Sequence, residues 1–210
     1  MPKYILPFLF TIFATTAQTN IKNITINPDI KKEVDKRIEE IQEFKTSPAI
    51  FDLYANSIVA DLYENDSLYF SNTSLNKRLP FKCFYLWQNN SLGINGSYGI
   101  FGGTGFYINI KDNEATLYHM LSADDFPMYA YTPKDKLIMR LEVPCTETKI
   151  VLSEIPDQSK KQVIYGYVEF KSHDYYSAGG AFAEGEVPDR KKCRSDMKIY
   201  FRSSFLNIPE

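Results

Sequence analysis

The chain has 210 residues, of which 44% are hydrophobic and 15% aromatic, and its formal net charge is -2. This length suits one domain with a sizeable core, and the aromatic content favours ordered structure rich in strands. The near balance of 24 basic and 26 acidic residues provides no positive field for a phosphate backbone, so nucleic acid is not an expected partner.

The first 17 residues have the pattern of a secretory signal. Lys3 is followed by an apolar run from Tyr4 to Ala14 and then by small residues up to Ala17. The run is too short to cross a bilayer as a helix, which needs roughly 20 apolar residues. We predict a signal peptide over 1–17, no later membrane span, and a secreted or periplasmic protein.

The next part of the chain predicts a helix. Residues 18–27 are polar and are expected to form a flexible lead. From Pro28 onward, apolar residues recur every three or four positions among charged ones, at Ile30, Val34, Ile38, Ile41 and Phe44. Asn27 suits the cap and Pro28 the first helical position. We therefore expect an N-terminal helical segment over 28–60, becoming extended after about Asn56.

A glycine-rich stretch from 93 to 121 organises the rest of the chain. Asn95-Gly96 is typical of a tight strand reversal, and Asp112-Asn113 separates two segments that alternate with period 2. These segments predict a β hairpin. The alternation also places His119 on the apolar face, where a hydrogen-bonded core imidazole is expected.

Short alternating segments continue to the end of the chain. They span 67–70, 81–88, 128–131, 137–143, 148–152, 163–171 and 197–202, and Pro144 is expected to end one of them. The pattern predicts a mainly β fold over 67–205, an antiparallel β sandwich or barrel, with the N-terminal amphipathic helical segment packed on it. The connection over 175–190 has three interpretations: disorder, a binding loop, or an extra hairpin.

Catalytic and cofactor motifs are absent from the sequence. The glycines lack the spacing of a phosphate loop, His119 and His173 do not form a local metal motif, and no G-x-S-x-G elbow occurs. We expect neither a metal nor another cofactor, and binding is a better expectation than enzyme activity. Cys83, Cys145 and Cys193 allow one disulfide of undetermined pairing or three free thiols.

Tyrosines form the candidate binding surface. Tyr165 and Tyr167 would share a face with Tyr200 if the last two long strands pair. Such a face would be either an open platform for a sugar or a protein, or the surface on which the helix packs. The candidate ligand-binding residues are Tyr165, Tyr167, Tyr200, Tyr175, Tyr176 and Phe182.

These patterns predict a secreted or periplasmic, non-catalytic binding or interaction module of unknown ligand. A glycan, a peptide or an envelope protein is the expected kind of partner, and the oligomeric state stays open. Two alternatives remain: a hydrolase whose acid and base residues come from distant loops, and a barrel that binds an apolar ligand.

Overall fold

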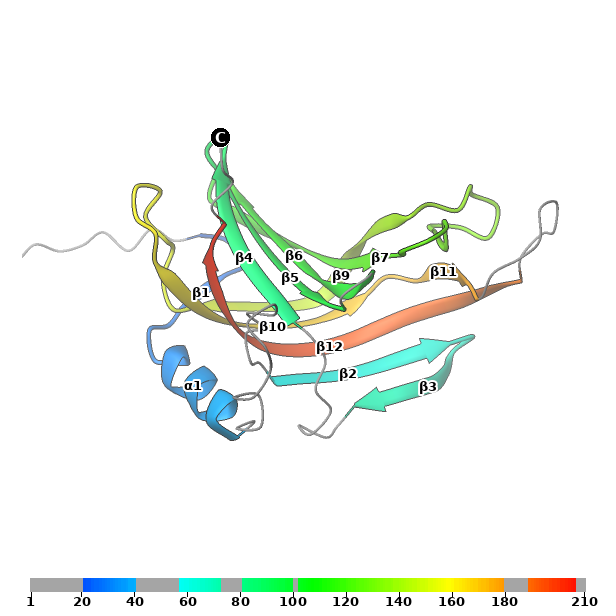
Figure 1. Ribbon diagram of the computed structural model, residues 1–210, viewed down its shortest axis with the longest axis horizontal. Helices are drawn as coiled ribbons and strands as arrows, with labels where there is room; N and C mark the ends of the chain where they lie inside the picture. Colours follow the sequence, from blue (N-terminus) through cyan, green and yellow to red (C-terminus); the bar gives the residue numbers. More distant parts are fainter. Residues whose placement is uncertain (1–20, 41–56, 73–80, 100–101, 180–188, 207–210) are drawn as a thin grey trace, which may run out of the picture.

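The computed structural model describes residues 21–40, 57–72, 81–99, 102–179 and 189–206. Within these ranges one helix accompanies a twelve-stranded, mostly antiparallel sheet (Figure 1). The elements are β1 (Thr25–Ile26), α1 (Ile30–Glu40), β2 (Ser57–Glu64), β3 (Ser67–Asn72), β4 (Phe81–Gln88), β5 (Ser91–Tyr98), β6 (Gly103–Lys111), β7 (Glu114–Ser122), β8 (Tyr129–Ala130), β9 (Arg140–Leu152), β10 (Val163–Ser172), β11 (Tyr175–Ala178) and β12 (Arg190–Phe205).

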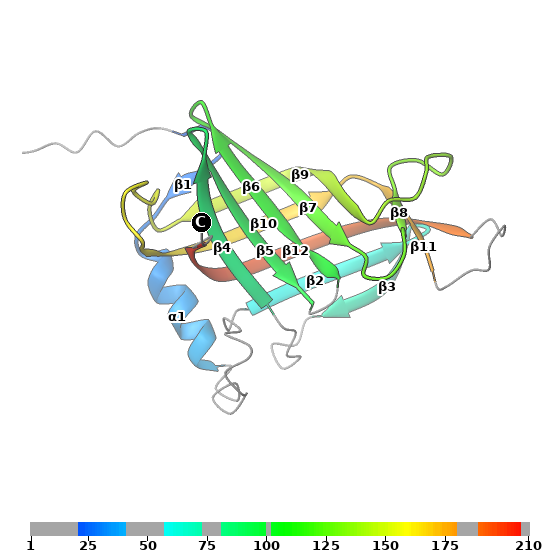
Figure 2. The ribbon, with the colours of Figure 1, turned by 45° about the horizontal axis from the view of Figure 1, so that its top comes forward.

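The sheet curves on itself into a near-barrel. Strand pairing follows the order β9-β7-β6-β5-β4-β12-β10 and returns to β9, which closes a ring. The contact between β12 and β4 is short and parallel, because it joins only Ser204 to Phe84 and Phe205 to Tyr85. Earlier in β12, residues 193–200 pair with β2 instead. Figure 2 shows β4 to β7 lying across the long β12, so the ring is closed at one end and open at the other.

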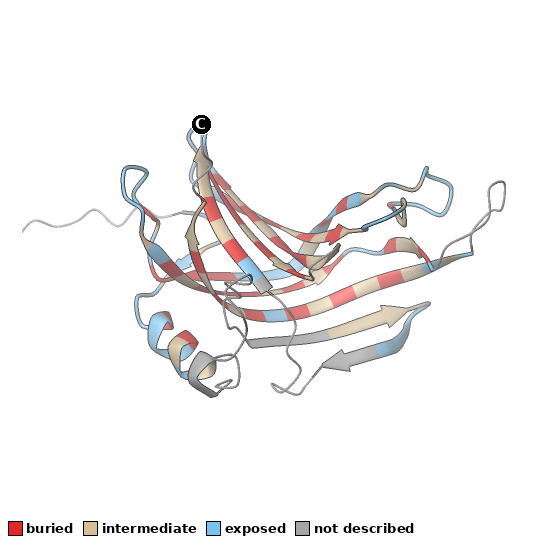
Figure 3. Ribbon diagram, viewed as in Figure 1, coloured by how far each residue is buried: buried red, intermediate tan, exposed pale blue. Residues whose placement is uncertain are grey.

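Side chains from the strands fill the closed end of the ring. Buried and more exposed residues alternate along the strands (Figure 3), as a sheet with one buried face requires. Phe106 and Phe201 are fully buried, and their ring centroids lie 4.9 Å apart. Each ring lies over a glycine on the neighbouring strand, Phe106 over Gly96 and Phe201 over Gly166. The two aromatic rings are therefore held between two glycines at the centre of the core.

The helix packs on the outside of the ring, as expected. The side chain of Asn27 accepts a hydrogen bond from the backbone N–H of Asp29 (3.0 Å) and caps α1. Ile30 and Val34 are buried against Val151 of β9 and a tyrosine of β10. This apolar contact confirms a mainly β fold with an amphipathic helix packed on it.

The Asn95-Gly96 turn was a wrong prediction. Both residues lie inside β5, where Asn95 pairs with Phe84 on one side and with Tyr107 on the other. The chain reverses instead at Asn89 and Asn90, which have φ values of 50° and 60°. Gly96 stands in the strand because the ring of Phe106 occupies the space of a side chain. The Asp112-Asn113 turn is confirmed, with φ values of 50° and 61°.

Pro144 does not end a strand, because β9 continues through it from Arg140 to Leu152. Proline has no N–H to donate, which usually excludes it from the middle of a sheet. In β9 it stands where the pairing with β7 stops, at the pair Tyr118–Pro144. Its carbonyl still accepts a hydrogen bond from the N–H of His173 (2.9 Å).

Two segments differ from the expected loose chain. In the 18–27 lead, the described part from Ile21 lies on the sheet: Thr25 and Ile26 pair in parallel with β9. In the 175–190 connection, β11 pairs with the start of β12, so the described ends form the extra hairpin among the three interpretations. Residues 1–17 and 41–56, which carry the predicted signal peptide and part of the predicted helical segment, lie outside the described residues. Among the described helices, none has the length and apolar character to cross a membrane.

Candidate functional site

Three of the candidate tyrosines lie beneath the helix. Tyr167 and Tyr200 pair across β10 and β12, with ring centroids 4.5 Å apart, and only 7% of Tyr167 is exposed. The guanidinium of Arg37 lies 3.9 Å from the ring centroid of Tyr200, and the ammonium of Lys31 lies 4.7 Å from that of Tyr165. The predicted shared face is confirmed, and α1 covers it, so these rings are not an open platform.

Two of the remaining candidates, Tyr175 and Tyr176, lie on opposite sides of β11. Tyr175 is buried and points to the inside of the ring, whereas Tyr176 follows it on the opposite side of β11 and is half-buried. Phe182 lies outside the described residues. Among the candidates that the structure describes, Tyr175 lines a hollow.

This hollow lies at the open end of the ring and is called the mouth below. It has a volume of about 390 Å³ and lies between β2, β3, the β5 and β6 ends and the β11–β12 hairpin. Its lining is largely apolar and aromatic, and comprises Leu62, Tyr63, Glu64, Tyr69, Tyr98, Gly99, Gly103, Thr104, Leu121, Tyr129, Tyr175, Ser177, Cys193 and Ser195. A largely apolar hollow of a few hundred Å³ with a few polar groups is typical of a small-molecule site.

Hydroxyl groups form the polar part of the mouth. The phenol oxygen of Tyr175 lies 3.3 Å from Oγ of Ser195, and both side chains are buried. The backbone N–H of Ser195 donates to Oγ of Ser172 (2.9 Å), which fixes β12 against the end of β10. Oγ1 of Thr104 lies 2.6 Å from Nε2 of His119, which stands behind the lining. This confirms the expected core imidazole with a hydrogen-bond partner.

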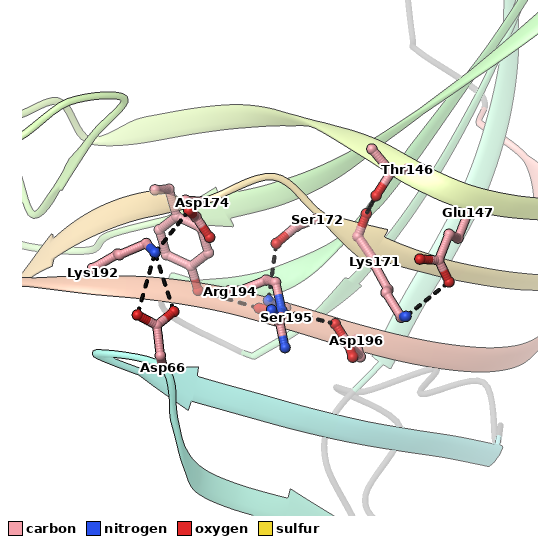
Figure 4. Close-up of polar contacts among 11 residues, drawn as sticks. Asp66, Thr146, Glu147, Lys171, Ser172, Asp174, Lys192, Arg194, Ser195 and Asp196 are labelled. Atoms are coloured by element: carbon pink, nitrogen blue, oxygen red, sulfur yellow. Dashed lines mark hydrogen bonds and ion pairs between the residues drawn. The ribbon is translucent and has the colours of Figure 1, made fainter.

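Ion pairs hold the walls of the mouth in place, and those of Lys192 are drawn in Figure 4. Nζ of Lys192 lies 3.1 Å from Asp66 in the β2–β3 turn and 3.1 Å from Asp174 before β11. One residue earlier in β12, Lys191 pairs with Glu64 of β2 (2.7 Å). These contacts join three segments that are distant in sequence, although each exposed pair contributes no more than about 1 kcal/mol.

The buried phenols and the thiol of the mouth, and the imidazole behind them, are uncharged at neutral pH. Burial raises the pKa of each of the phenols Tyr98, Tyr129 and Tyr175, and it raises that of the Cys193 thiol to about 11. Burial also lowers the pKa of His119 to about 3, so the imidazole stays neutral. These groups can donate or accept hydrogen bonds, but they supply neither a thiolate nor an imidazolium near pH 7.

Comparison with family models, with curated proteins and with solved structures found no match for this chain. Among the described residues, no three His, Cys, Asp or Glu side chains lie together in a way that could hold a metal ion. His173 is exposed after β10, away from the buried His119.

The three cysteines are free thiols in the structure, which leaves the one-disulfide interpretation without support. Burial raises the pKa values of both Cys83 and Cys145 to about 12. Because the thiolate is the reactive form, such thiols are poorly reactive.

Sequence reasoning missed most of the mouth. Leu121 was recognisable as a buried position by its alternation, but Tyr98 follows the wrongly predicted turn, Tyr129 lies in a two-residue strand and Tyr69 in an edge strand. Nothing local in the sequence indicates that these four residues meet. They come together because β12 pairs with β10, β11 and β2 over different parts of its length.

Proposed function

We propose that this protein is a non-catalytic binding protein that takes a small apolar molecule into the mouth of its near-barrel. The observation that carries the proposal is the hollow of about 390 Å³ with aromatic and aliphatic walls. Its buried hydroxyls, on Tyr175 and Ser195, would bind a single hydroxyl or carbonyl group of the ligand. This joins two expectations from the sequence, the binding module and the barrel with an apolar ligand.

Binding suits this site better than hydrolysis. Among the described lining residues Glu64 is the one carboxylate, and it pairs with Lys191. Glycoside cleavage generally needs two facing carboxyl groups, and nucleophilic catalysis needs an activated thiol or hydroxyl with a base. The described lining supplies neither arrangement. Glu64 has no facing carboxyl group there, the thiol stays protonated, and His119, whose pKa is lowered to about 3, is too weak a base to activate the Thr104 hydroxyl beside it.

The first test uses the purified protein directly. Organic extraction followed by mass spectrometry should release a stoichiometric apolar compound, or the protein should bind the neutral fluorescent probe N-phenyl-1-naphthylamine saturably at one site. Ser177 lines the mouth, so Ser177→Trp should fill it and abolish probe binding. Tyr176→Trp adds the same indole on the opposite side of β11 and is the matched control.

Two results would contradict the proposal. One is a protein that releases no compound and binds no apolar probe. The other is probe binding that Ser177→Trp and Tyr176→Trp weaken equally, since this would place the probe elsewhere.

We also propose that the protein acts outside the cytoplasm, since residues 1–17 have the pattern of an export signal. Buried, poorly reactive thiols are compatible with an oxidising compartment. Expression of the full sequence followed by N-terminal sequencing of the exported fraction should give a chain that begins at Gln18. Retention of an intact Met1 form inside the cell would contradict export.

A further inference from the structure

A second hollow, called the outer groove below, lies on the outer face of the ring. It has a volume of about 300 Å³ and crosses β4, β5, β6, β7 and β9. Its lining comprises Lys82, Phe84, Asn95, Ser97, Tyr98, Gly99, Gly102, Gly103, Thr104, Met120, Leu121, Ser122 and Arg140. Lys82 and Phe84 alternate with the buried Cys83 and Tyr85, so the groove lies on the face of the sheet opposite the core.

Small residues make the groove possible. In register across the sheet, Gly105 stands between Ser97 and Met120, and Gly103 stands beside Ser122. A β-carbon on Gly105 would lie 1.9 Å from the carbonyl oxygen of Gly96, so no larger residue fits between β5 and β6 here. The outer face of the sheet therefore has a strip without side chains at these glycines, with larger side chains on both sides of it.

The charge of the outer groove is positive and unbalanced. Lys82 stands on β4 and Arg140 on β9, and neither forms an ion pair with the described part of the chain. No carboxylate is among the described lining residues. Glu142 is not in the lining, but it lies on the same face, opposite Met120 and two residues from Arg140. It also adds to the raised pKa of Tyr107, for which burial is the larger cause.

The two cations are far apart. Four strand-to-strand steps separate β4 from β9 along the sheet, which corresponds to about 19 Å at the usual spacing of neighbouring strands. Asn95, Ser97 and Ser122 lie between them and offer one amide and two hydroxyls. Phe84 and Met120 add apolar surface beside these polar groups.

We propose that the outer groove binds an extended acidic oligosaccharide, with one carboxylate at Lys82 and another at Arg140. The sugar hydroxyls pair with Asn95, Ser97 and Ser122, and the apolar faces of the sugar rings lie on Phe84 and Met120. This site adjoins the mouth at Tyr98, Gly99, Gly103, Thr104 and Leu121, but its proposed ligand contacts lie on the outer face, whereas the mouth opens on the inner side of the sheet. The proposal therefore does not depend on the proposed function.

An acidic peptide fits the groove less well. Peptides usually bind to sheets by adding a strand at an edge, where backbone groups are free. The groove crosses five paired strands, whose N–H and C=O groups already bond to one another. Between the two cations, a peptide backbone would have only the side chains of Asn95, Ser97 and Ser122 as hydrogen-bond partners. A sugar loses less, because its outward hydroxyls stay bonded to water.

The test is calorimetric titration of the full-length mature protein. The probes are unbranched uronate oligosaccharides of different linkage (galacturonate, mannuronate and guluronate), their neutral methyl esters, and a glutamate oligopeptide of similar length. At least one free acid should bind, its methyl ester should not, and added salt should weaken binding. Lys82→Gln and Arg140→Gln should each weaken binding about tenfold, the effect of one charge-assisted hydrogen bond.

Lys111→Gln is the matched control, because it removes the same charge from an exposed position at the far end of β6. Ser177→Trp, which fills the mouth, should leave uronate binding unchanged. The proposal is overturned if no free uronate binds, if methyl esters bind equally, or if Lys111→Gln weakens binding as much as Lys82→Gln. Equal binding of the glutamate peptide would overturn the assignment to a saccharide.

Discussion

The packing of the Phe106 ring over Gly96 predicts that Gly96→Ala destabilises the protein, which is the opposite of the usual effect of replacing glycine by alanine. Replacing glycine by alanine normally stabilises a protein by about 0.4–1 kcal/mol, because the unfolded chain loses freedom. At position 96 a β-carbon would lie 2.3 Å from Cε1 and 2.6 Å from Cζ of Phe106. Favourable carbon contacts need about 3.5 Å or more, so the ring would have to move by about 1 Å.

The ring of Phe106 has little room for that movement. It is fully buried, and the ring of Phe201 lies behind it with a centroid distance of 4.9 Å. Overpacking of this kind costs about 1–3 kcal/mol, which exceeds the usual gain from alanine. We therefore expect Gly96→Ala to lower the free energy of unfolding by about 1–2 kcal/mol.

The assay is equilibrium unfolding in urea, followed by the fluorescence of Trp87, the single tryptophan of the chain. Gly179→Ala is the control, because a β-carbon at this position meets nothing within 4 Å. It should leave the protein as stable as before or slightly more stable. Adding Phe106→Leu to Gly96→Ala should recover part of the loss, and a double-mutant cycle measures this coupling. The reasoning is refuted if Gly96→Ala stabilises the protein as Gly179→Ala does.

Three further predictions test the helix and the core. Val34→Ala should lower the free energy of unfolding by about 1–2 kcal/mol because Val34 is fully buried between α1 and the sheet; no loss in urea unfolding would contradict that packing. Asn27→Ala should cost about 1 kcal/mol in the same assay by removing the helix cap, and Asn27→Asp should cost much less. Because burial lowers the pKa of His119 from 6.5 to about 3, its contribution to stability is complete above pH 6.5 and is lost as the pH falls toward 3. The free energy of unfolding should therefore be about 1.4 kcal/mol lower at pH 5.5 than at pH 7. His119→Gln should remove most of this difference, and an unchanged pH dependence in that variant would refute the assignment to His119.

The alternation of side chains was readable from the sequence because it is a local property. Period 2 around Asp112-Asn113 predicted both strands of that hairpin and placed His119 on the buried face. The cap at Asn27 and the start of α1 were likewise readable, since a helix cap depends on neighbouring residues. The pairing of Tyr167 with Tyr200 followed from the same alternation once the last two long strands were paired.

Other features required knowledge of what lies on the neighbouring strand. Asn95-Gly96 has the composition of a turn, but its glycine makes room for a ring that is ten residues away in sequence. Pro144 is compatible with a strand only because the pairing between β9 and β7 ends at that residue.

The sequence by itself determined most of the long strands, where the helix begins and which side of those strands is apolar, because these depend on contacts within a few residues. Tertiary structure decided that α1 covers Tyr167 and Tyr200 and that Tyr175 lines a hollow. It also decided that Lys82 and Arg140 share one groove. For the tyrosines the reason is the route of β12, which pairs with β11, β2, β10 and β4 over different parts of its length. For the groove it is the pairing of β9 with β7. Pairing between strands so distant in sequence leaves no periodic pattern in the chain, so it fixes which surfaces are covered and which remain open.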